Sequence, residues 1–385
     1  MTFLNFMSIK NNSVENKERL LSLDALRGFD MFWITGGSVL FAYIGQVTGL
    51  EWLTKQMDHP DWAGIRFYDL IFPLFMFISG VAIPYAIGSR IEKKVPKGKL
   101  VAKAFKRMIV LVVLGIIYND GLKGNLGNIR YASVLGQIGL AYFFASLIFI
   151  YTTSFKSRLF WLAGILVAVA CAQLFIPVPG FGAGVLTPEG SINGYIDRHL
   201  LPGRLAYRPD GRMTDGNGIY DALGLLCIIS AIAITLMGTV AGHFLRGKER
   251  TALQKVYLLA GIGAALLILS LIIHPFYPII KKCWTSSYNL FAGGISFILM
   301  ALFYLVIDVM KREKWSFYFR VIGLNSIFVY LFVHFVNVDS LVGFVLGWST
   351  AMFGDALKII PLIGYLAVVW GLLYFMYKRR IFIKV

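Results

Sequence analysis

A histidine flanked by two aspartates is the stretch of the sequence best suited to proton transfer. In "MDHPDWAG", His59 lies between Asp58 and Asp61, and Pro60 biases it toward an extended conformation. A histidine held by a carboxylate can act as a general base near neutral pH. We therefore predict that His59 is a catalytic base whose ring is oriented or acidified by Asp58 and Asp61. The alternative is a surface histidine in a loop, with Asp61 capping a short helix.

A second acid, Asp69, stands at the start of the apolar stretch "FYDLIFPLFMFISG". Acids within a membrane span are costly, so by default they indicate a function or a buried partner. Pro73 follows one helical turn later and frees the carbonyl of Asp69 from its helical hydrogen bond. Asp69 is therefore interpreted either as a residue that contacts a ligand or as a cap of the helix N-terminus.

Polar side chains also recur along one side of an expected helix in the C-terminal part of the chain. The stretch "GLNSIFVYLFVHFVN" places them at helical spacing within an otherwise apolar run. The residues are Asn325, Ser326, Tyr330, His334 and Asn337. They are interpreted either as the wall of a polar tunnel or as groups that form hydrogen bonds between helices.

Two further polar clusters lie at the ends of expected spans. "KKCWTSSYN" contains Trp284 and Ser286, and "MTDGNGIYD" contains Asp215. An aromatic ring beside hydroxyl and carboxylate groups is a common way to hold a sugar. Trp284 alone would be read as an ordinary residue of the membrane interface.

The elements that must position these residues are membrane-spanning helices. Hydrophobic residues make up 58% of the 385 residues, and the mean hydropathy is +0.71, which is more apolar surface than a soluble domain can bury. Runs of about 20 apolar residues, each long enough to cross the hydrocarbon core as a helix, recur along the chain. We predict an all-α polytopic membrane protein with about ten transmembrane helices. The expected spans are 23–47, 67–88, 104–118, 132–151, 158–176, 218–245, 255–273, 287–309, 318–337 and 357–377.

The distribution of basic residues predicts the orientation of these spans. The formal net charge is +17, and 26 of the 37 Lys and Arg residues fall on one side of the expected helices. The positive-inside rule makes that side cytosolic, and both termini with it. The basic charge is therefore expected to attract anionic lipid headgroups or a phosphorylated ligand, and it does not indicate nucleic acid. Arg27, which can pair with Asp24, is either a structural residue or one that meets such a phosphate.

The chain is expected to form one domain. Residues 1–22 are predicted to be a cytoplasmic segment without the apolar core of a cleavable signal, followed by a single transmembrane domain over 23–385. The long loop 177–216 is expected on the outer side, ordered and functional. The apolar segment 340–354 is too short to span and is interpreted as re-entrant or interfacial.

Five motifs occur in the order found in one known family. They are "LLSLDALRGFD", "HPDWAGIRFYDLIFPLFMFISG", "GYIDRHLL", "KKCWTSSY" and "GLNSIFVYLFVH". Together they make the sequence resemble the transmembrane heparan-α-glucosaminide N-acetyltransferase family and its bacterial homologues over nearly the whole chain. The first motif alone also resembles other membrane acyltransferase families. The chain departs from the family where V-L-Q-R is replaced by Val134–Gln137, "VLGQ", and where an Asn of the first span is replaced near Ile34–Thr35.

The resemblance implies a transmembrane acyltransferase domain with His59 as its catalytic histidine. An acetyl group would pass from cytosolic acetyl-CoA to the amine of a glucosamine-type sugar on the outer side, directly or through an acetyl-histidine. Residues expected at acetyl-CoA are Arg27, Lys106, Arg107, Gln137, Asn325, Ser326, Tyr330 and His334. Residues expected at the acceptor are Asp69, Asp197, Arg198, Asp215, Trp284 and Ser286, with Asp215 the first candidate for the ammonium group.

Other functions stay open at this point. The acceptor is not named by the sequence, so O-acetylation of an extracytoplasmic glycan is one alternative. A sugar permease would explain the polar stripe but not the basic cluster or the His59 loop, and a non-catalytic scaffold would leave the buried polar groups without a use. The expected partners are acetyl-CoA, an amino-sugar or glycan acceptor and membrane lipids, with a homodimer as a candidate assembly and no metal. The expected location is the inner membrane of a bacterium.

Overall fold

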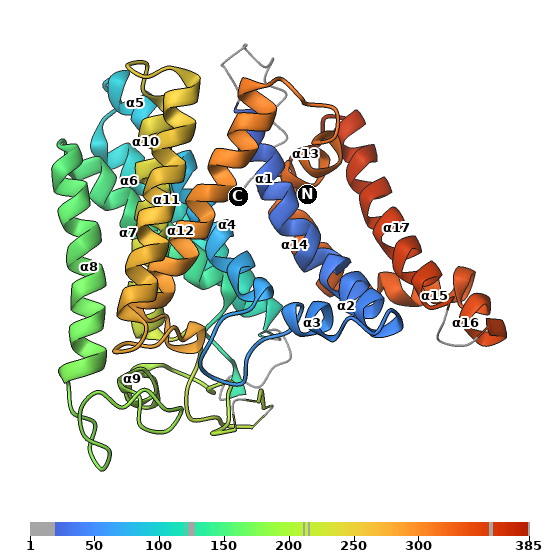
Figure 1. Ribbon diagram of the computed structural model, residues 1–385, viewed down its shortest axis with the longest axis horizontal. Helices are drawn as coiled ribbons and strands as arrows, with labels where there is room; N and C mark the ends of the chain where they lie inside the picture. The colour runs from blue at the N-terminus through green and yellow to red at the C-terminus, as the bar shows by residue number, and fades with distance from the viewer. Residues whose placement is uncertain are drawn as a thin grey trace, which may run out of the picture. The chain divides into compact units, whose positions relative to one another are not determined.

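The computed structural model describes residues 20–119, 121, 128–210, 212–214, 216–353 and 357–383. Within these residues the chain is helical, and β pairing is limited to isolated bridges. The α-helices (Figure 1) are α1 (Leu21–Phe32), α2 (Ser38–Val47), α3 (Glu51–Gln56), α4 (Ile71–Ile83), α5 (Ser89–Glu92), α6 (Lys97–Tyr118), α7 (Val134–Tyr151), α8 (Phe155–Phe175), α9 (Ile192–Leu200), α10 (Leu225–Arg246), α11 (Ala252–Ile273), α12 (Ser286–Phe303), α13 (Phe317–Gly323), α14 (Ser326–Phe335), α15 (Val338–Leu346), α16 (Trp348–Phe353) and α17 (Ile359–Lys378). Short 3₁₀- and π-helical elements are η1 (Trp33–Gly37), η2 (Phe67–Leu70), η3 (Pro84–Gly88), η5 (Lys281–Cys283) and η6 (Tyr304–Val309).

Seven helical stretches among the described residues are long and apolar enough to cross a membrane, or eight if the bent pair α13–α14 is one span. The seven are Phe67–Glu92, Val134–Tyr151, Phe155–Phe175, Leu225–Arg246, Ala252–Ile273, Ser286–Val309 and Ile359–Lys378. This confirms the polytopic helical membrane protein that the apolar runs predicted. The total of about ten spans and the cytosolic position of both termini stay predictions.

Two expected spans are not continuous helices. The segment 23–47 is interrupted by η1, where Thr35 and Gly36 leave the helical conformation. The segment 318–337 is bent by 75° between α13 and α14. At the bend, the Asn325 side chain donates to the carbonyl of Ile381 and accepts the N–H of Ile383, at 3.0 and 2.9 Å. The Asn325 amide therefore holds the segment that follows α17, which is closer to the hydrogen-bonding interpretation of the polar stripe than to the tunnel wall.

The bend also divides the predicted polar stripe. Ser326, Tyr330 and His334 lie on α14, but Asn325 precedes it and Asn337 follows it. The side chain of Asn337 caps α15 by accepting the N–H of Ser340 at 3.0 Å. The prediction of five polar residues on one helix was wrong, because Asn side chains satisfy backbone groups at helix ends better than at helix centres.

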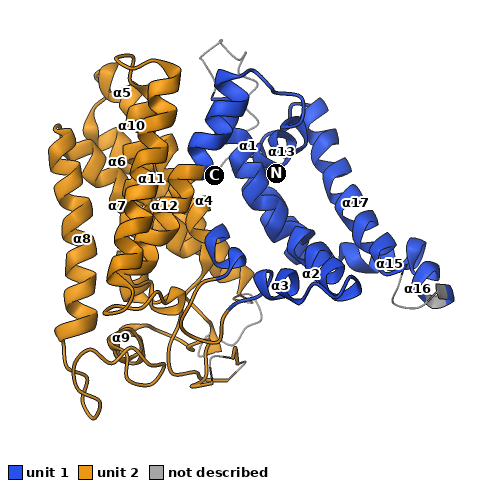
Figure 2. Cartoon of the chain, in the orientation of Figure 1, with its two compact units in different colours: residues 1–59, 66–71, 299–385 blue, residues 60–65, 72–298 orange. Residues whose placement is uncertain are grey.

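The chain divides into two compact units (Figure 2). Unit 1 comprises residues 1–59, 66–71 and 299–385, and unit 2 comprises residues 60–65 and 72–298. In unit 1, α1 packs closely against α13 at Gly28 and Gly323. A Cβ atom on Gly28 would lie 1.7 Å from the Phe319 carbonyl oxygen, and one on Gly323 would lie 2.1 Å from that of Asp24. Small residues thus allow the two backbones to touch, as in other membrane helix pairs.

In unit 2 the long helices run side by side, with α9 and its loops at one end (Figure 1). The central helix α10 contacts α7, α8 and α9. It also approaches α4 closely, since a Cβ atom on Gly80 or on Gly238 would lie 2.0 Å from a carbonyl oxygen of the other helix. Ser133 caps α7 and Ser191 caps α9, each by accepting a backbone N–H three residues ahead. Unit 2 is therefore a helix bundle with a structured loop region at one end.

The two irregular segments named from the sequence both contain structure. The loop 177–216 holds α9 and isolated bridges between Val178 and Gly182 and between Tyr207 and Met213. The segment 340–354 forms most of α15 and the short helix α16, each shorter than a membrane span.

Candidate active site

His59 lies in the turn that follows α3, and both sides of its backbone are fixed. The Asp58 carboxylate accepts the His59 N–H at 2.7 Å. The Arg66 guanidinium donates to the His59 carbonyl at 2.9 Å and lies 3.8 Å from the Asp58 carboxylate. The Tyr68 ring lies beside the imidazole, with the two centroids 5.3 Å apart. Hydrogen bonds to the N–H and to the carbonyl of His59 therefore fix the backbone that carries the imidazole.

Asp69 approaches the same imidazole from η2, the short helix that leads into α4. One carboxylate oxygen accepts the Arg66 N–H at 2.9 Å in a capping arrangement, and the other lies 2.6 Å from His59 Nδ1. The Asp69 side chain is fully buried, whereas 42% of the His59 side chain is exposed. A buried acid thus supports a histidine ring that reaches the surface.

This geometry selects one tautomer of the imidazole. A carboxylate accepts hydrogen bonds and does not donate them, so Nδ1 carries the proton that points at Asp69. The Nε2 atom is then the nitrogen with the basic lone pair. A ring oriented in this way can take a proton from a nucleophile, or can itself attack an electrophilic carbon.

The carboxylate on the ring differs from the sequence prediction. Asp58 and Asp61 were expected to orient His59, and Asp69 was expected to contact the acceptor. In the structure Asp69 contacts the ring and Asp58 holds the backbone. The carbonyl of Asp61 accepts a hydrogen bond from Lys282 Nζ at 2.6 Å. Arg66, which fixes the turn, was missed because one arginine in a loop carries no distinctive pattern.

The segment 60–65 belongs to unit 2 and is held by contacts within that unit. Trp62 Nε1 donates to the Leu186 carbonyl at 2.5 Å, in the long loop. Gly64 has a φ of +104° and donates its N–H to the Ile279 carbonyl at 2.9 Å. Only glycine adopts such a φ without strain. The residues that follow His59 are therefore also held in a defined turn.

The residues expected at the donor lie in both units. In unit 1, the guanidinium of Arg27 lies 3.5 Å from the Asp24 carboxylate, one helical turn away on α1. On α14, Ser326 is buried and His334 is exposed. Whether these side chains meet acetyl-CoA stays a prediction.

In unit 2, Lys106 is exposed on α6, and the Arg107 guanidinium stacks over the Tyr142 ring at 4.1 Å. Gln137 on α7 is 1% exposed and donates to the Cys227 carbonyl at 3.0 Å. The Gln137 side-chain oxygen has no hydrogen-bond partner within the described residues. Gln137 is therefore buried within the bundle and Arg107 is half-buried against Tyr142, and the donor role of both residues stays a prediction.

Two residues expected at the acceptor support the loop structure. Asp197 on α9 is 1% exposed and accepts the N–H of Leu225 at 3.0 Å, at the start of α10. Burial raises the pKa of this carboxyl from its ordinary value to about 7. Arg198 donates to the carbonyls of Ile219 and Glu189 at 2.8 and 3.2 Å. Through these contacts, Asp197 and Arg198 each hold backbone groups of neighbouring segments, which is a structural role.

The remaining acceptor residues are buried or lie outside the described residues. Trp284 is 1% exposed, and its ring packs edge-on against Phe72 and Tyr288. Ser286 is 6% exposed and donates to the Leu166 carbonyl at 2.6 Å. This packing gives no support to sugar stacking by Trp284. Asp215, the first candidate for the ammonium group, lies outside the described residues.

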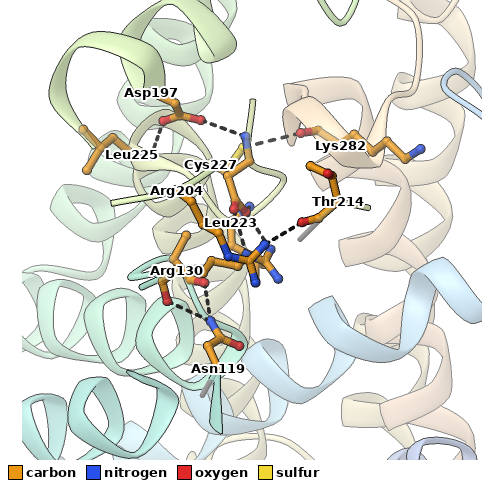
Figure 3. A network of polar contacts seen from close by, with 11 residues as sticks. Asn119, Arg130, Asp197, Arg204, Thr214, Leu223, Leu225, Cys227 and Lys282 are labelled. Carbon is orange, nitrogen blue, oxygen red and sulfur yellow. Dashed lines mark hydrogen bonds and ion pairs between the residues drawn. The ribbon is translucent and has the colours of Figure 1, made fainter. Parts of the chain in front are cut away.

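A buried ion pair that sequence reasoning missed anchors the loop region. Arg130 donates twice to the Asp221 carboxylate, both bonds at 2.8 Å. Burial disfavours the charge, but the bonds to Asp221 raise the pKa of Arg130 overall. Around it, Asn119 donates to the Arg130 carbonyl and Arg204 donates to the Thr214 carbonyl (Figure 3). The partners are far apart in the sequence, so no local pattern indicates the pair.

Comparison with known proteins places the chain near one family. A family model described as "Domain of unknown function (DUF5009)" matches residues 19–178. The chain is 26% identical over 360 residues to the heparan-alpha-glucosaminide N-acetyltransferase of Mus musculus, covering 81% of this chain and 53% of that protein. It is 27% identical over 361 residues to the Homo sapiens protein of the same name, covering 81% and 52%.

These similarities confirm the resemblance found in the motifs as a distant relationship. The chain spans about half the length of the curated relatives it matches. Fold class and site geometry agree with a helical membrane protein that carries a histidine–carboxylate pair.

Proposed function

We propose that this protein is a membrane acetyltransferase that moves an acetyl group from acetyl-CoA to the amine of a glucosamine-type sugar. The observation that carries the proposal is the 2.6 Å contact between His59 Nδ1 and the buried Asp69 carboxylate. The similarity to two N-acetyltransferases supports the reaction type. His59 is the catalytic residue and Asp69 is a positioning residue.

The reaction needs one proton acceptor near the sugar amine. The ammonium group gives a proton to His59 Nε2, and the neutral amine attacks the thioester carbonyl carbon. The carbon–sulfur bond breaks, the attacking nitrogen loses its second proton, and the thiolate takes up that proton to leave as CoA with a free thiol. One proton is released for each acetyl group transferred. A positioned base contributes about 10²–10⁴-fold to such a step.

A covalent route uses the same pair. His59 Nε2 attacks the thioester carbon and the carbon–sulfur bond breaks, so CoA leaves as a thiolate that takes a proton from water. The acetyl-imidazolium then passes its acetyl group to the neutral amine, and the nitrogen gives up a proton to water. Asp69 stabilises the positive charge that develops on the ring in both routes. Trapping an acetyl-histidine after mixing with acetyl-CoA alone favours the second route.

The donor is expected to enter from the basic side of the membrane. Arg27, Lys106 and Arg107 are our candidates for the CoA phosphates, because guanidinium and ammonium groups bind phosphate strongly. Binding of acetyl-CoA should then weaken as salt is added, since charge attraction is screened.

The test is sugar-dependent thiol release by purified protein in detergent. With acetyl-CoA and glucosamine, we expect free thiol from the wild type and none above background from His59→Ala. Calorimetry should show that His59→Ala still binds acetyl-CoA, because Arg27, Lys106 and Arg107, our candidates for the CoA phosphates, are unchanged in this variant. An active His59→Ala protein would exclude both routes.

The same assay separates the alternatives. Sugar uptake into liposomes without acetyl-CoA, and no thiol release, would identify a permease. Replacing glucosamine by N-acetylglucosamine tests the acceptor atom, because that sugar has hydroxyl groups but no free amine. Thiol release with N-acetylglucosamine would favour O-acetylation.

A further inference from the structure

One end of unit 2 gathers basic residues from three segments of the chain. The ranges 89–99, 152–158 and 246–255 hold eleven Lys and Arg residues and two acids, Glu92 and Glu249. They contain the connections from α5 to α6, from α7 to α8 and from α10 to α11. In Figure 1, α5 lies at the end of unit 2 opposite α9. We call these three ranges the basic end of unit 2, and the positive-inside rule predicts that it is cytosolic.

Side-chain contacts bring the three segments together. At the end of α10, Arg246 donates to the Glu92 carboxylate on α5 at 2.5 Å. At the start of α6, the Lys97 ammonium lies over the ring of Tyr151, the last residue of α7, at 5.3 Å from its centre. The basic end is therefore one surface built by several helices.

Arg158, near the start of α8, is held in place but only partly used. Its guanidinium lies 3.9 Å from the centre of the Phe149 ring and donates to the carbonyl and hydroxyl of Thr152 at 3.0 and 3.4 Å. The other three of its five N–H groups have no hydrogen-bond partner among the described residues. Arg246 approaches the same ring, since a Cβ atom on Gly88 would lie 3.0 Å from an Arg246 nitrogen and 3.6 Å from Phe149.

The cations of the basic end repel one another. Arg158, Arg246 and Arg250 all act electrostatically on the His243 ring, which stacks on Phe155 with centroids 4.7 Å apart. Like charges gathered on one surface oppose folding, and the two acids do not balance eleven cations. An anion at this end would therefore bind favourably and relieve the repulsion.

Exposed apolar side chains begin directly beside these cations. Tyr151 at the end of α7 and Phe160 and Trp161 on α8 are all exposed. Only 11% of the most apolar stretch of α8 is buried, compared with 83% of that of α10. A ligand at the basic end can thus place a charged group on the arginines and an apolar chain along α8.

We propose that the basic end of unit 2 binds an anionic phospholipid, with Arg158 and Arg246 on the headgroup phosphate and the acyl chains along the exposed side of α8. Guanidinium groups match phosphate oxygens in charge and geometry, and cytoplasmic leaflets carry anionic lipids. A free phosphate would leave the apolar flank without a role. The inference does not rest on the proposed function, because it uses none of the residues assigned to the reaction.

The test is a lipid titration of the purified protein followed by native mass spectrometry. The probes are phosphatidylglycerol and phosphatidylcholine with the same acyl chains. We expect the anionic lipid to bind more tightly to the wild type, and salt to weaken that preference. Arg158→Gln and Arg246→Gln should each weaken phosphatidylglycerol binding about 5-fold, the effect of one basic residue near a membrane surface. Binding of phosphatidylcholine should not change.

Arg208→Gln is the matched control, because it removes the same charge from an exposed arginine in the long loop 177–216. It should leave the affinity for both lipids unchanged. Thermal unfolding in neutral lipid shows whether each variant folds. If Arg158→Gln does not fold, Arg246→Gln and Lys97→Gln decide the question, because Lys97 is exposed and contacts only the surface of Tyr151 in the basic end.

Three results would overturn the lipid site. Equal affinity of the wild type for the two lipids would remove the charge recognition. An equal loss in Arg208→Gln would mean that net charge, and not this surface, attracts the lipid. Glycerol 3-phosphate that binds as tightly as phosphatidylglycerol would show that the acyl chains take no part and that a soluble phosphate is the ligand.

Discussion

Two carboxylate pairs in this molecule have similar contact distances but very different surroundings. In unit 2, Arg130 meets Asp221 through two bonds of 2.8 Å, and the side chains are 9% and 0% exposed. In unit 1, His59 meets Asp69 through one contact of 2.6 Å, and the ring is 42% exposed. In the first arrangement, two N–H groups of the guanidinium donate to the carboxylate, and both side chains are buried. The second joins one ring nitrogen to one carboxylate oxygen, with the imidazole side chain partly exposed.

The comparison teaches how to separate structural pairs from reactive ones. A buried, bidentate ion pair is stable because the charged atoms of both side chains have hydrogen-bond partners. Removal of one side chain therefore leaves an unpaired buried charge. A half-exposed imidazole contributes less to stability, and its carboxylate instead fixes tautomer and direction. Substitutions should therefore affect stability in unit 2 and turnover in unit 1.

The largest effect is expected for Arg130→Met. This variant leaves the Asp221 carboxylate buried without its cation, and breaking a buried pair costs about 3–5 kcal/mol. Thermal unfolding of the purified protein in detergent should show a clear fall in midpoint. His59→Ala, measured in parallel, should unfold near the wild-type temperature. Similar losses in both variants would remove the distinction between the pairs.

The double variant Arg130→Met with Asp221→Leu sharpens this result. It removes the orphaned charge as well as the cation, so much of the stability should return. If the double variant is no better than Arg130→Met alone, packing around Tyr207 rather than the ion pair accounts for the loss. The Arg130 guanidinium lies 5.8 Å from the centre of that ring.

A third carboxylate, Asp197, extends the comparison to an acid whose two oxygens accept backbone N–H groups, from Asp221 and Leu225, within the described residues. Its pKa is raised to about 7 by burial, from an ordinary value of 3.8. The unfolded chain releases this proton near pH 4 and the folded protein near pH 7, so the folded state binds more protons between these values. Stability should therefore fall as pH rises from about 4 to about 7, by up to about 4 kcal/mol.

Asp197→Asn should flatten that part of the stability profile. The amide oxygen can still accept the N–H of Leu225, but no charge forms as pH rises. Unfolding midpoints from pH 4 to pH 8 for both proteins provide the measurement. A wild-type profile that is as flat as that of Asp197→Asn would show that the carboxyl does not titrate in this range.

Asp69→Asn is expected to lower turnover about 10²-fold, at the lower end of what a positioned base contributes. The amide can still cap η2 through its oxygen, so the fold should persist. It no longer stabilises a positive ring, and acetyl-CoA affinity should stay unchanged. Asp58→Asn is the control, because Asp58 bonds to the His59 backbone and not to the reacting ring in our proposal. Equal losses in the two variants would contradict the assigned roles.

The fold class could be predicted because hydropathy acts over about 20 residues at a time. The helices α7, α8, α10, α11 and α17 follow the expected apolar runs. The break at η1 and the bend before α14 could not be predicted in this way, since both depend on a few local residues. The stretch Gly323–Asn325, "GLN", is the kind of signal that ends a helix, and it was not used.

The site was predictable only in part. His59 stands out from its neighbours in the sequence, but the carboxylate on its ring is set by how η2 returns toward the turn. Arg130 and Asp221 are joined only by the fold. Contacts between distant segments leave little trace in one sequence.

The smallest effect is expected at Gly64, where the question is whether the turn after His59 must be rigid. An alanine at φ +104° is strained although no neighbour lies within 4 Å of a Cβ atom there, and the cost is about 1–2 kcal/mol. Gly98→Ala is the matched control, because that site is equally open and lies in the first turn of α6 without a positive φ. Alanine there should stabilise the helix by up to about 1 kcal/mol. We expect Gly64→Ala to lower both the unfolding temperature and turnover, with a smaller loss of turnover than Asp69→Asn. Opposite signs for the two alanines in thermal unfolding would support a backbone cause, whereas equal behaviour would mean that the turn adapts and that Asp69 alone fixes the ring.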